Sequence, residues 1–213
     1  MGTVVPPGSV VVSDWHRSQE GKEYFGTLLR RNRRRFFGIQ TTTVYWPAKL
    51  RESGRALFFR FSIWDCGDAV LKKFDHILPS CTEKVDGFLF LFSFTDRASF
   101  EELPSQISRV TEGAKNAVKM VIGTKFDQFA HSDVTEHDVA AFCHTWGLPV
   151  LRAKSINAPR LADGQSLDGR AGLSDMAHLL NGLSEHLWRQ DQWAAGLLPP
   201  LTSPGSSEEP AFS

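Results

Sequence analysis

Three short polar segments of the sequence have residue types and positions that suit ligand binding. Each lies at the end of an apolar run, and in open α/β sheets ligands bind beyond the carboxyl ends of the strands. The segments are residues 64–67 (WDCG), 123–127 (GTKFD) and 152–155 (RAKS). Asp65 and Thr124 are 59 residues apart, and Thr124 and Lys154 are 30 apart. This order and spacing predict one site built from three strand ends.

Asp127 is suited to the recognition of a guanine base. A carboxylate only accepts hydrogen bonds, and guanine offers two adjacent donors, N1–H and N2–H, which adenine does not offer as a pair. The stem of Lys125 can lie along the base plane, while the Ala153 N–H serves the guanine O6 and Lys154 flanks the ring. Each residue alone also fits a turn, a helix cap or a solvated surface. The candidate guanine-binding residues are Thr124, Lys125, Phe126, Asp127, Ala153 and Lys154.

The first segment is the candidate for the phosphate side of the same site. Asp65 would hold a Mg²⁺ ion through water, and the backbone N–H of Gly67 would meet a terminal phosphate. The seven histidines show no paired spacing with cysteine, so a zinc site is not expected. No catalytic residue is assigned.

Apolar runs before and between these segments predict the elements that position them. Strands are expected at residues 41–46, 56–64, 87–94, 118–122 and 149–151, with a hairpin turn at 52–54. Apolar positions at helical spacing predict a helix through Val139 and Trp146 and a last helix from Met176 to Leu187. Alternation of strand and helix after residue 56 predicts an α/β fold with a largely parallel sheet.

Composition indicates one domain with tails. The 213 residues are 41% hydrophobic, and the three cysteines fit a reducing compartment better than a disulfide framework. No apolar run approaches the roughly 20 residues of a membrane span, and no signal peptide or lipid-anchor motif is found. We expect a basic, partly disordered N-terminal segment at 1–40, a domain at 41–190 and a disordered tail at 191–213.

Zero net charge conceals an asymmetry between the two parts of the chain. Residues 1–60 hold 11 basic against four acidic side chains, and the remainder holds 13 against 20. Five of the basic side chains lie in the cluster from Arg30 to Arg35. The cluster fits a solvated segment, or a contact with an acidic protein surface or an anionic membrane. Nucleic acid is disfavoured, because aromatic and basic residues do not interleave there.

The three segments together resemble the Ras superfamily of small GTPases, in which DxxG, NKxD and SAK loops follow successive strands. Residues 86–94 and 96–101 resemble the Ras and Rab stretch between the second and third loops. More narrowly, residues 38–49, 64–67, 71–76 and 161–164 resemble a divergent Rem- and Rab-like branch linked to ciliogenesis and planar polarity. The resemblance covers nearly all of residues 8–198.

The resemblance implies a P-loop NTPase-type sheet with helices on both faces, and GTP or GDP with Mg²⁺ as ligands. It implies a regulator or adaptor in cilium biogenesis, vesicle trafficking, exocytosis and protein transport. The implied partners are proteins of a planar polarity effector assembly, and the implied location is cytoplasmic, at the cytoskeleton and the ciliary basal body. The alternative is a nucleotide-free scaffold, or an unstable isoform, that acts only through protein contacts.

The sequence departs from the family on the phosphate side. It contains no GxxxxGK[ST] motif, and Phe36-Phe37 stands where a threonine is expected before Gly38. Both losses are explained if the first strand, the phosphate loop and the first helix are missing between Arg35 and Gly38. Asp65 and Gly67 are one residue closer than in DxxG, and the glutamine that orients water is absent. We therefore expect weak or absent GTP binding, and we do not expect GTP hydrolysis.

In the small-GTPase sheet, the missing first strand is central, between the strand ending at Trp64 and the strand at 87–94. Three arrangements of a chain without this strand are possible. The sheet closes directly, Val10 to Val12 move into the vacancy, or the chain folds poorly because buried backbone groups lose their partners.

Overall fold

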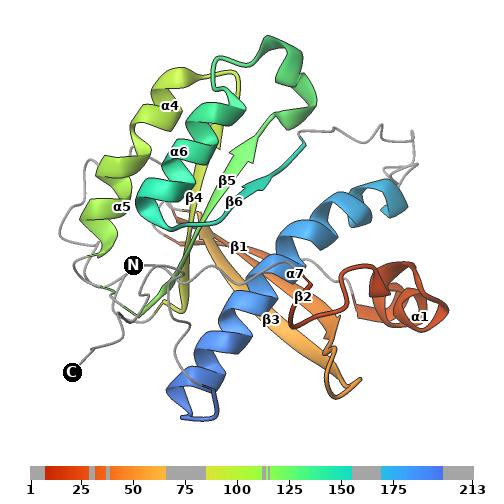
Figure 1. Cartoon of the computed structure of the whole chain (residues 1–213). Helices are drawn as coiled ribbons and strands as arrows, with labels where there is room; N and C mark the ends of the chain where they lie inside the picture. Colours follow the sequence, from red (N-terminus) through yellow and green to blue (C-terminus); the bar gives the residue numbers. More distant parts are fainter. Residues whose placement is uncertain are drawn as a thin grey trace, which may run out of the picture.

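A computed structural model describes residues 8–28, 32–36, 39–65, 85–111, 114, 116–154 and 169–198. Its strands form two three-stranded sheets (Figure 1). The first is antiparallel, in the order β1 (Asn32–Phe36), β2 (Ile39–Lys49) and β3 (Ala56–Asp65). The second is parallel, in the order β4 (Gly87–Ser93), β5 (Val118–Thr124) and β6 (Val150–Arg152). The α/β class and the five expected strands are confirmed.

The antiparallel sheet is built around the expected hairpin. β2 and β3 pair continuously from Gln40 opposite Asp65 to Lys49 opposite Ala56, and the turn contains Gly54 at a positive φ of 66°. Trp46 and Phe61 lie in one apolar cluster, because alternate residues of a strand point to the same face. β1 was not expected, since its sequence, NRRRF, has no apolar pattern.

Both faces of the parallel sheet pack against apolar clusters, as its apolar strands predicted. β4 pairs with β5 from Gly87 opposite Val118 to Ser93 opposite Thr124. Phe90 and Phe92 pack on one side, and Leu89 packs on the other. At the end of β5, a Cβ on Gly123 would lie within 3.0 Å of the Phe92 ring. A residue larger than glycine would therefore displace this ring.

Helices complete the described part of the chain. They are η1 (Trp15–Arg17), α1 (Gln19–Leu28), α4 (Arg97–Glu101), α5 (Leu103–Thr111), η3 (Phe126–His131), α6 (Glu136–Trp146) and α7 (Gly169–Ala194). A capping box between Thr135 and Asp138 begins α6, and Gly147 at φ 61° ends it. The two helices expected from apolar spacing are confirmed as α6 and α7. No helix within the described ranges has both the length and the apolar composition of a membrane span.

The helices pack against the sheets through two apolar clusters. Phe100, Ile107 and Phe142 of α4, α5 and α6 pack against one face of the parallel sheet. Leu180 and Leu183 of α7 pack in a second cluster, which contains residues from both sheets. Figure 1 shows α7 crossing the strands, and its contacts reach both β2 and β5. α7 therefore connects the two sheets, which share no strand.

The break between the sheets lies between β3 and β4, where the resemblance places the missing first strand. Neither of the two arrangements that would fill that vacancy is observed. The sheet does not close, because β3 and β4 are not hydrogen-bonded neighbours. Val11 pairs with Leu50 at the far edge of β2, so the hypothesis that Val10 to Val12 fill the vacancy is wrong. The N-terminal segment lies beside that edge of β2, where Arg51 N–H donates to Val10 O at 2.8 Å.

The side chain of Glu185 on α7 tethers the N-terminal segment. Its carboxylate, only 1% exposed, accepts hydrogen bonds from the N–H groups of Gly8 (3.0 Å), Val10 (3.1 Å) and Val11 (3.0 Å). Val12 in turn donates to Lys49 O at 2.9 Å. We call residues 8–14 the N-terminal arm. The arm thus joins the antiparallel sheet to α7.

Candidate functional site at the ends of β5 and β6

The second and third polar segments meet at one corner of the parallel sheet. The Ala153 N–H donates to Gly123 O at 2.7 Å, and the Phe126 N–H donates to Ala153 O at 3.1 Å. These two bonds place the segments that carry Asp127 and Lys154 side by side. Both of these side chains are exposed at the corner, where a ligand can reach them.

Lys125 turns the chain from β5 into η3. Its φ of 57° is left-handed, and no other non-glycine residue in the described ranges has a positive φ. Such a backbone conformation costs of the order of 1–3 kcal/mol and occurs often at binding sites. Asp127 follows in the first turn of η3. The strained turn therefore sets the position from which Asp127 would meet a base.

Thr124 and Ala153 have structural partners at this corner. The Thr124 hydroxyl donates to Phe92 O at 2.8 Å and so ties the end of β5 to β4. The Ala153 N–H, expected to serve the guanine O6, is already bonded to Gly123 O. A base oxygen would have to share or displace that bond. Recognition of guanine would thus depend mainly on Asp127.

Phe126 anchors the loop instead of facing solvent as a base contact. Its ring packs 5.1 Å from the Phe94 ring and 5.2 Å from the Phe129 ring, between centroids. The Arg152 guanidinium lies 5.6 Å from the centroid of Phe126 and forms an ion pair with Glu136 at the start of α6. Sequence reasoning missed this contact, because no local pattern links a strand-end arginine to an aromatic ring 26 positions earlier.

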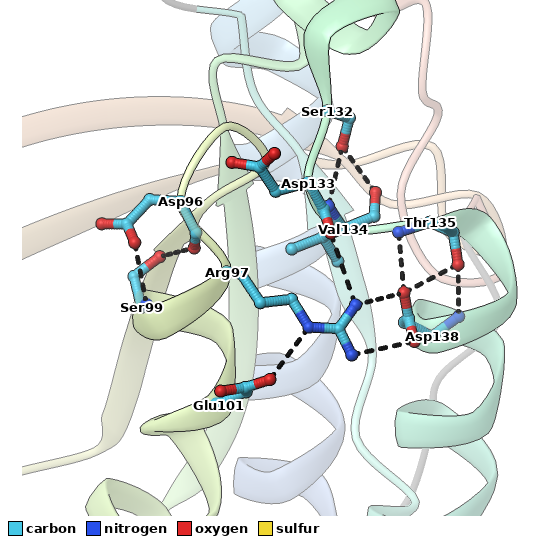
Figure 2. Close-up of polar contacts among 9 residues, drawn as sticks. All are labelled: Asp96, Arg97, Ser99, Glu101, Ser132, Asp133, Val134, Thr135 and Asp138. Atoms are coloured by element: carbon cyan, nitrogen blue, oxygen red, sulfur yellow. Dashed lines mark hydrogen bonds and ion pairs between the residues drawn. The ribbon is translucent and has the colours of Figure 1, made fainter.

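A polar network centred on Arg97 holds the loop that follows η3 (Figure 2). The Arg97 guanidinium donates to the Asp138 carboxylate at 2.9 and 3.3 Å, to Glu101 at 3.0 Å and to Asp133 O at 3.3 Å. Ser132 donates to Phe94 O at 2.9 Å, which fixes the same loop to the end of β4. The network therefore braces the connection between the candidate site and α6.

The Asp138 carboxylate is ionised over a wide pH range. Hydrogen bonds from the Thr135 hydroxyl and N–H, followed by those from Arg97, lower the pKa of Asp138 to about 2. Thr135 and Arg97 donate to Asp138 only in the folded loop, so the lowered pKa of Asp138 depends on the geometry of this corner.

The phosphate side is not assembled from the described residues. Asp65 ends β3 and is exposed, and within the described ranges no hydrogen bond or ion pair joins its carboxylate to Asp127 or Lys154. Gly67 lies outside the described residues. The described ranges also contain no group of three His, Cys, Asp or Glu side chains that could hold a metal ion. The oxygen donors among the described residues do not fit a Mg²⁺ site.

The chain is similar to known proteins over most of its length. A family model described as "Ras family" matches residues 43–159. Three relatives carry the name "Ciliogenesis and planar polarity effector 2". The protein from Homo sapiens is 51% identical, with 91% of this chain and 95% of the relative covered. Those from Mus musculus and Danio rerio are 49% and 44% identical, with 94% and 90% of this chain and 99% and 91% of the relatives covered.

These alignments contain more positions than the chain has residues. The alignment with the human relative spans 244 positions, whereas 91% of the 213-residue chain is about 194 residues. About 50 aligned positions therefore have no counterpart in this chain. The shortfall agrees with an internal segment missing relative to these proteins.

Proposed function

This chain belongs to the Ras family, and we propose that it is a small-GTPase-like regulator or adaptor that keeps the guanine-recognition corner but lacks the phosphate-binding part. The observation that carries the proposal is the hydrogen-bonded junction of the two segments holding Asp127 and Lys154. The family implies GTP or GDP with Mg²⁺ in general. Binding by this particular chain is part of the proposal.

At the corner, the Asp127 carboxylate accepts the guanine N1–H and N2–H, and the stems of Lys125 and Lys154 flank the ring. The phosphate side contributes little, since the sequence has no GxxxxGK[ST] loop whose backbone amides and lysine would cradle the anion. Asp65 and Gly67 remain as its remnant. We therefore propose weak guanine-nucleotide binding without hydrolysis.

The cellular role is proposed from the names of the relatives, which refer to ciliogenesis and planar polarity effectors. The proposal is that this chain acts with protein partners in cilium biogenesis and the associated vesicle trafficking, protein transport and exocytosis, at the basal body and cytoskeleton. A contact of the cluster from Arg30 to Arg35 with anionic membrane is a further part of this proposal and rests on the sequence alone.

Calorimetric titration of the purified chain tests the base preference. We expect GDP and GTP to bind, ATP not to bind, and Asp127→Asn to shift the preference from guanine toward xanthine, because the amide replaces an acceptor with a donor. The matched control is Asp86→Asn, at an exposed position before β4. If Asp127→Asn leaves the guanine preference intact, the role of Asp127 is wrong.

A nucleotide-free scaffold is the second candidate. It is favoured by the Ala153 N–H being bonded within the protein and by the divided sheet. It predicts that a complex with a protein partner forms equally well in nucleotide-free buffer and in saturating GTP. A complex that requires GTP would exclude it.

A further inference from the structure

Four strand edges, on β1, β3, β4 and β6, have no neighbour among the described residues, and those of β3 and β4 flank the break between the two sheets. β3 is paired along one side only, with β2, and β4 is paired along one side only, with β5. The β4 sequence, GFLFLFS, is uncharged, and β3 contains two charged residues, Arg60 and, at its end, Asp65. Natural proteins protect such edges with charges, prolines or covering elements, because a free edge pairs with other chains.

The two edges border the same core. Leu89 of β4 and Ile63 of β3 both pack against the apolar cluster that lies under α7. Beyond Leu89 this cover ends on β4, whereas Trp64, next to Ile63 in the chain, points to the opposite, exposed face of β3. Leu91 of β4 is 56% exposed, and Trp64 of β3 is 51% exposed. An apolar strand lying beside β3 and β4 would cover these two side chains.

We propose that the free edges of β3 and β4 bind an extended, predominantly apolar strand supplied by another polypeptide. The unpaired N–H and C=O groups of the two edges give main-chain hydrogen bonds, and Leu91 and Trp64 give apolar contacts. The shortfall of about 50 positions against the relatives agrees with a place left open in this chain. The proposal does not depend on nucleotide binding.

A single strand fits this place better than a second copy of the chain does. An occupant lying between β3 and β4 must offer hydrogen-bonding groups on both of its sides. Each of the six described strands already has at least one side paired. A described strand of a second copy could therefore satisfy only one edge, whereas an isolated segment of about seven residues matches the length of β4.

A fluorescent peptide with the sequence of β5, VKMVIGT, is a suitable probe, because β5 already pairs with β4 in parallel register. We expect it to bind the full chain and to slow hydrogen exchange in β4. The control peptide, VKMPIGT, lacks one N–H and should not bind. Leu91→Lys should weaken binding about tenfold or more, since an ammonium group would be buried against an apolar strand. Leu197→Lys, at a residue 69% exposed beyond α7, should leave binding unchanged.

Three results would overturn the proposal. The first is that VKMVIGT does not bind, and the second is that the proline peptide binds equally well. The third is concentration-dependent dimerisation of the chain in sedimentation that Leu91→Lys abolishes. Such dimerisation would assign the edge to a second copy. All measurements are made without nucleotide, so failure here leaves the guanine titration to be judged separately.

Discussion

At the residue scale, Asp138 gives the clearest dependence on pH. Its folded pKa, about 2, lies below the ordinary value of 3.8, so its contribution to stability is present above pH 3.8 and is lost as the pH falls toward 2. In Asp138→Asn, the urea midpoint of unfolding should fall less between pH 3.8 and pH 2 than it does in wild type. The exposed Glu52→Gln should keep the wild-type profile; an unchanged profile for Asp138→Asn would show that the Arg97 network does not act as described.

His186 should act in a higher pH window. Burial lowers the pKa of this imidazole below 6.5, and its Nδ1–H donates to Gly182 O at 2.8 Å. The unfolded chain then binds the proton more readily, so the contribution of His186 is full above pH 6.5 and is lost as the pH falls below it. Urea midpoints between pH 7.5 and 5.5 should fall less in His186→Gln than in wild type. His144→Gln, on the exposed side of α6, is the control, and an equal slope in both variants would refute this role.

At the element scale, the N-terminal arm depends on Glu185. Glu185→Ala would leave three backbone donors without their acceptor, and an unsatisfied buried donor costs about 1–3 kcal/mol. We expect a loss of about 3 kcal/mol or more in unfolding free energy, together with fast hydrogen exchange at Val10 and Val11. Glu52→Ala should change neither quantity. Retained protection at Val10 and Val11 in Glu185→Ala would contradict the tether.

Elements with local patterns could be predicted from the sequence, and long-range contacts could not. The uncharged run of β4 and the helical spacing of Leu180 and Leu183 indicated their elements directly. β1 has no apolar pattern, and its pairing with β2 depends on the hairpin they form. Glu185 lies 174 positions from Val11, and nothing near either residue indicates that they meet. The corner of Asp127 and Lys154 was predicted by spacing, whereas the brace by Arg152 and Phe126 was not.

At the scale of the whole molecule, α7 and the N-terminal arm link two sheets that share no strand. The division follows from the vacancy between β3 and β4, so the two sheets should not unfold as one unit. Hydrogen exchange in low urea should release β2 and β3 before β4 and β5, because the parallel sheet is covered on both faces. Simultaneous release of all four strands would show that α7 couples the sheets fully.

The central claim is that the molecule keeps a guanine-binding corner without a phosphate cradle. Calorimetric affinities for guanosine, GDP and GTP, each with Mg²⁺, test it most directly, because the three ligands share the base and differ in phosphates. We predict dissociation constants within about threefold of one another and weaker than about 1 μM, since only the base is held. GTP or GDP binding about a thousandfold tighter than guanosine would contradict the account, as would no binding of any of the three.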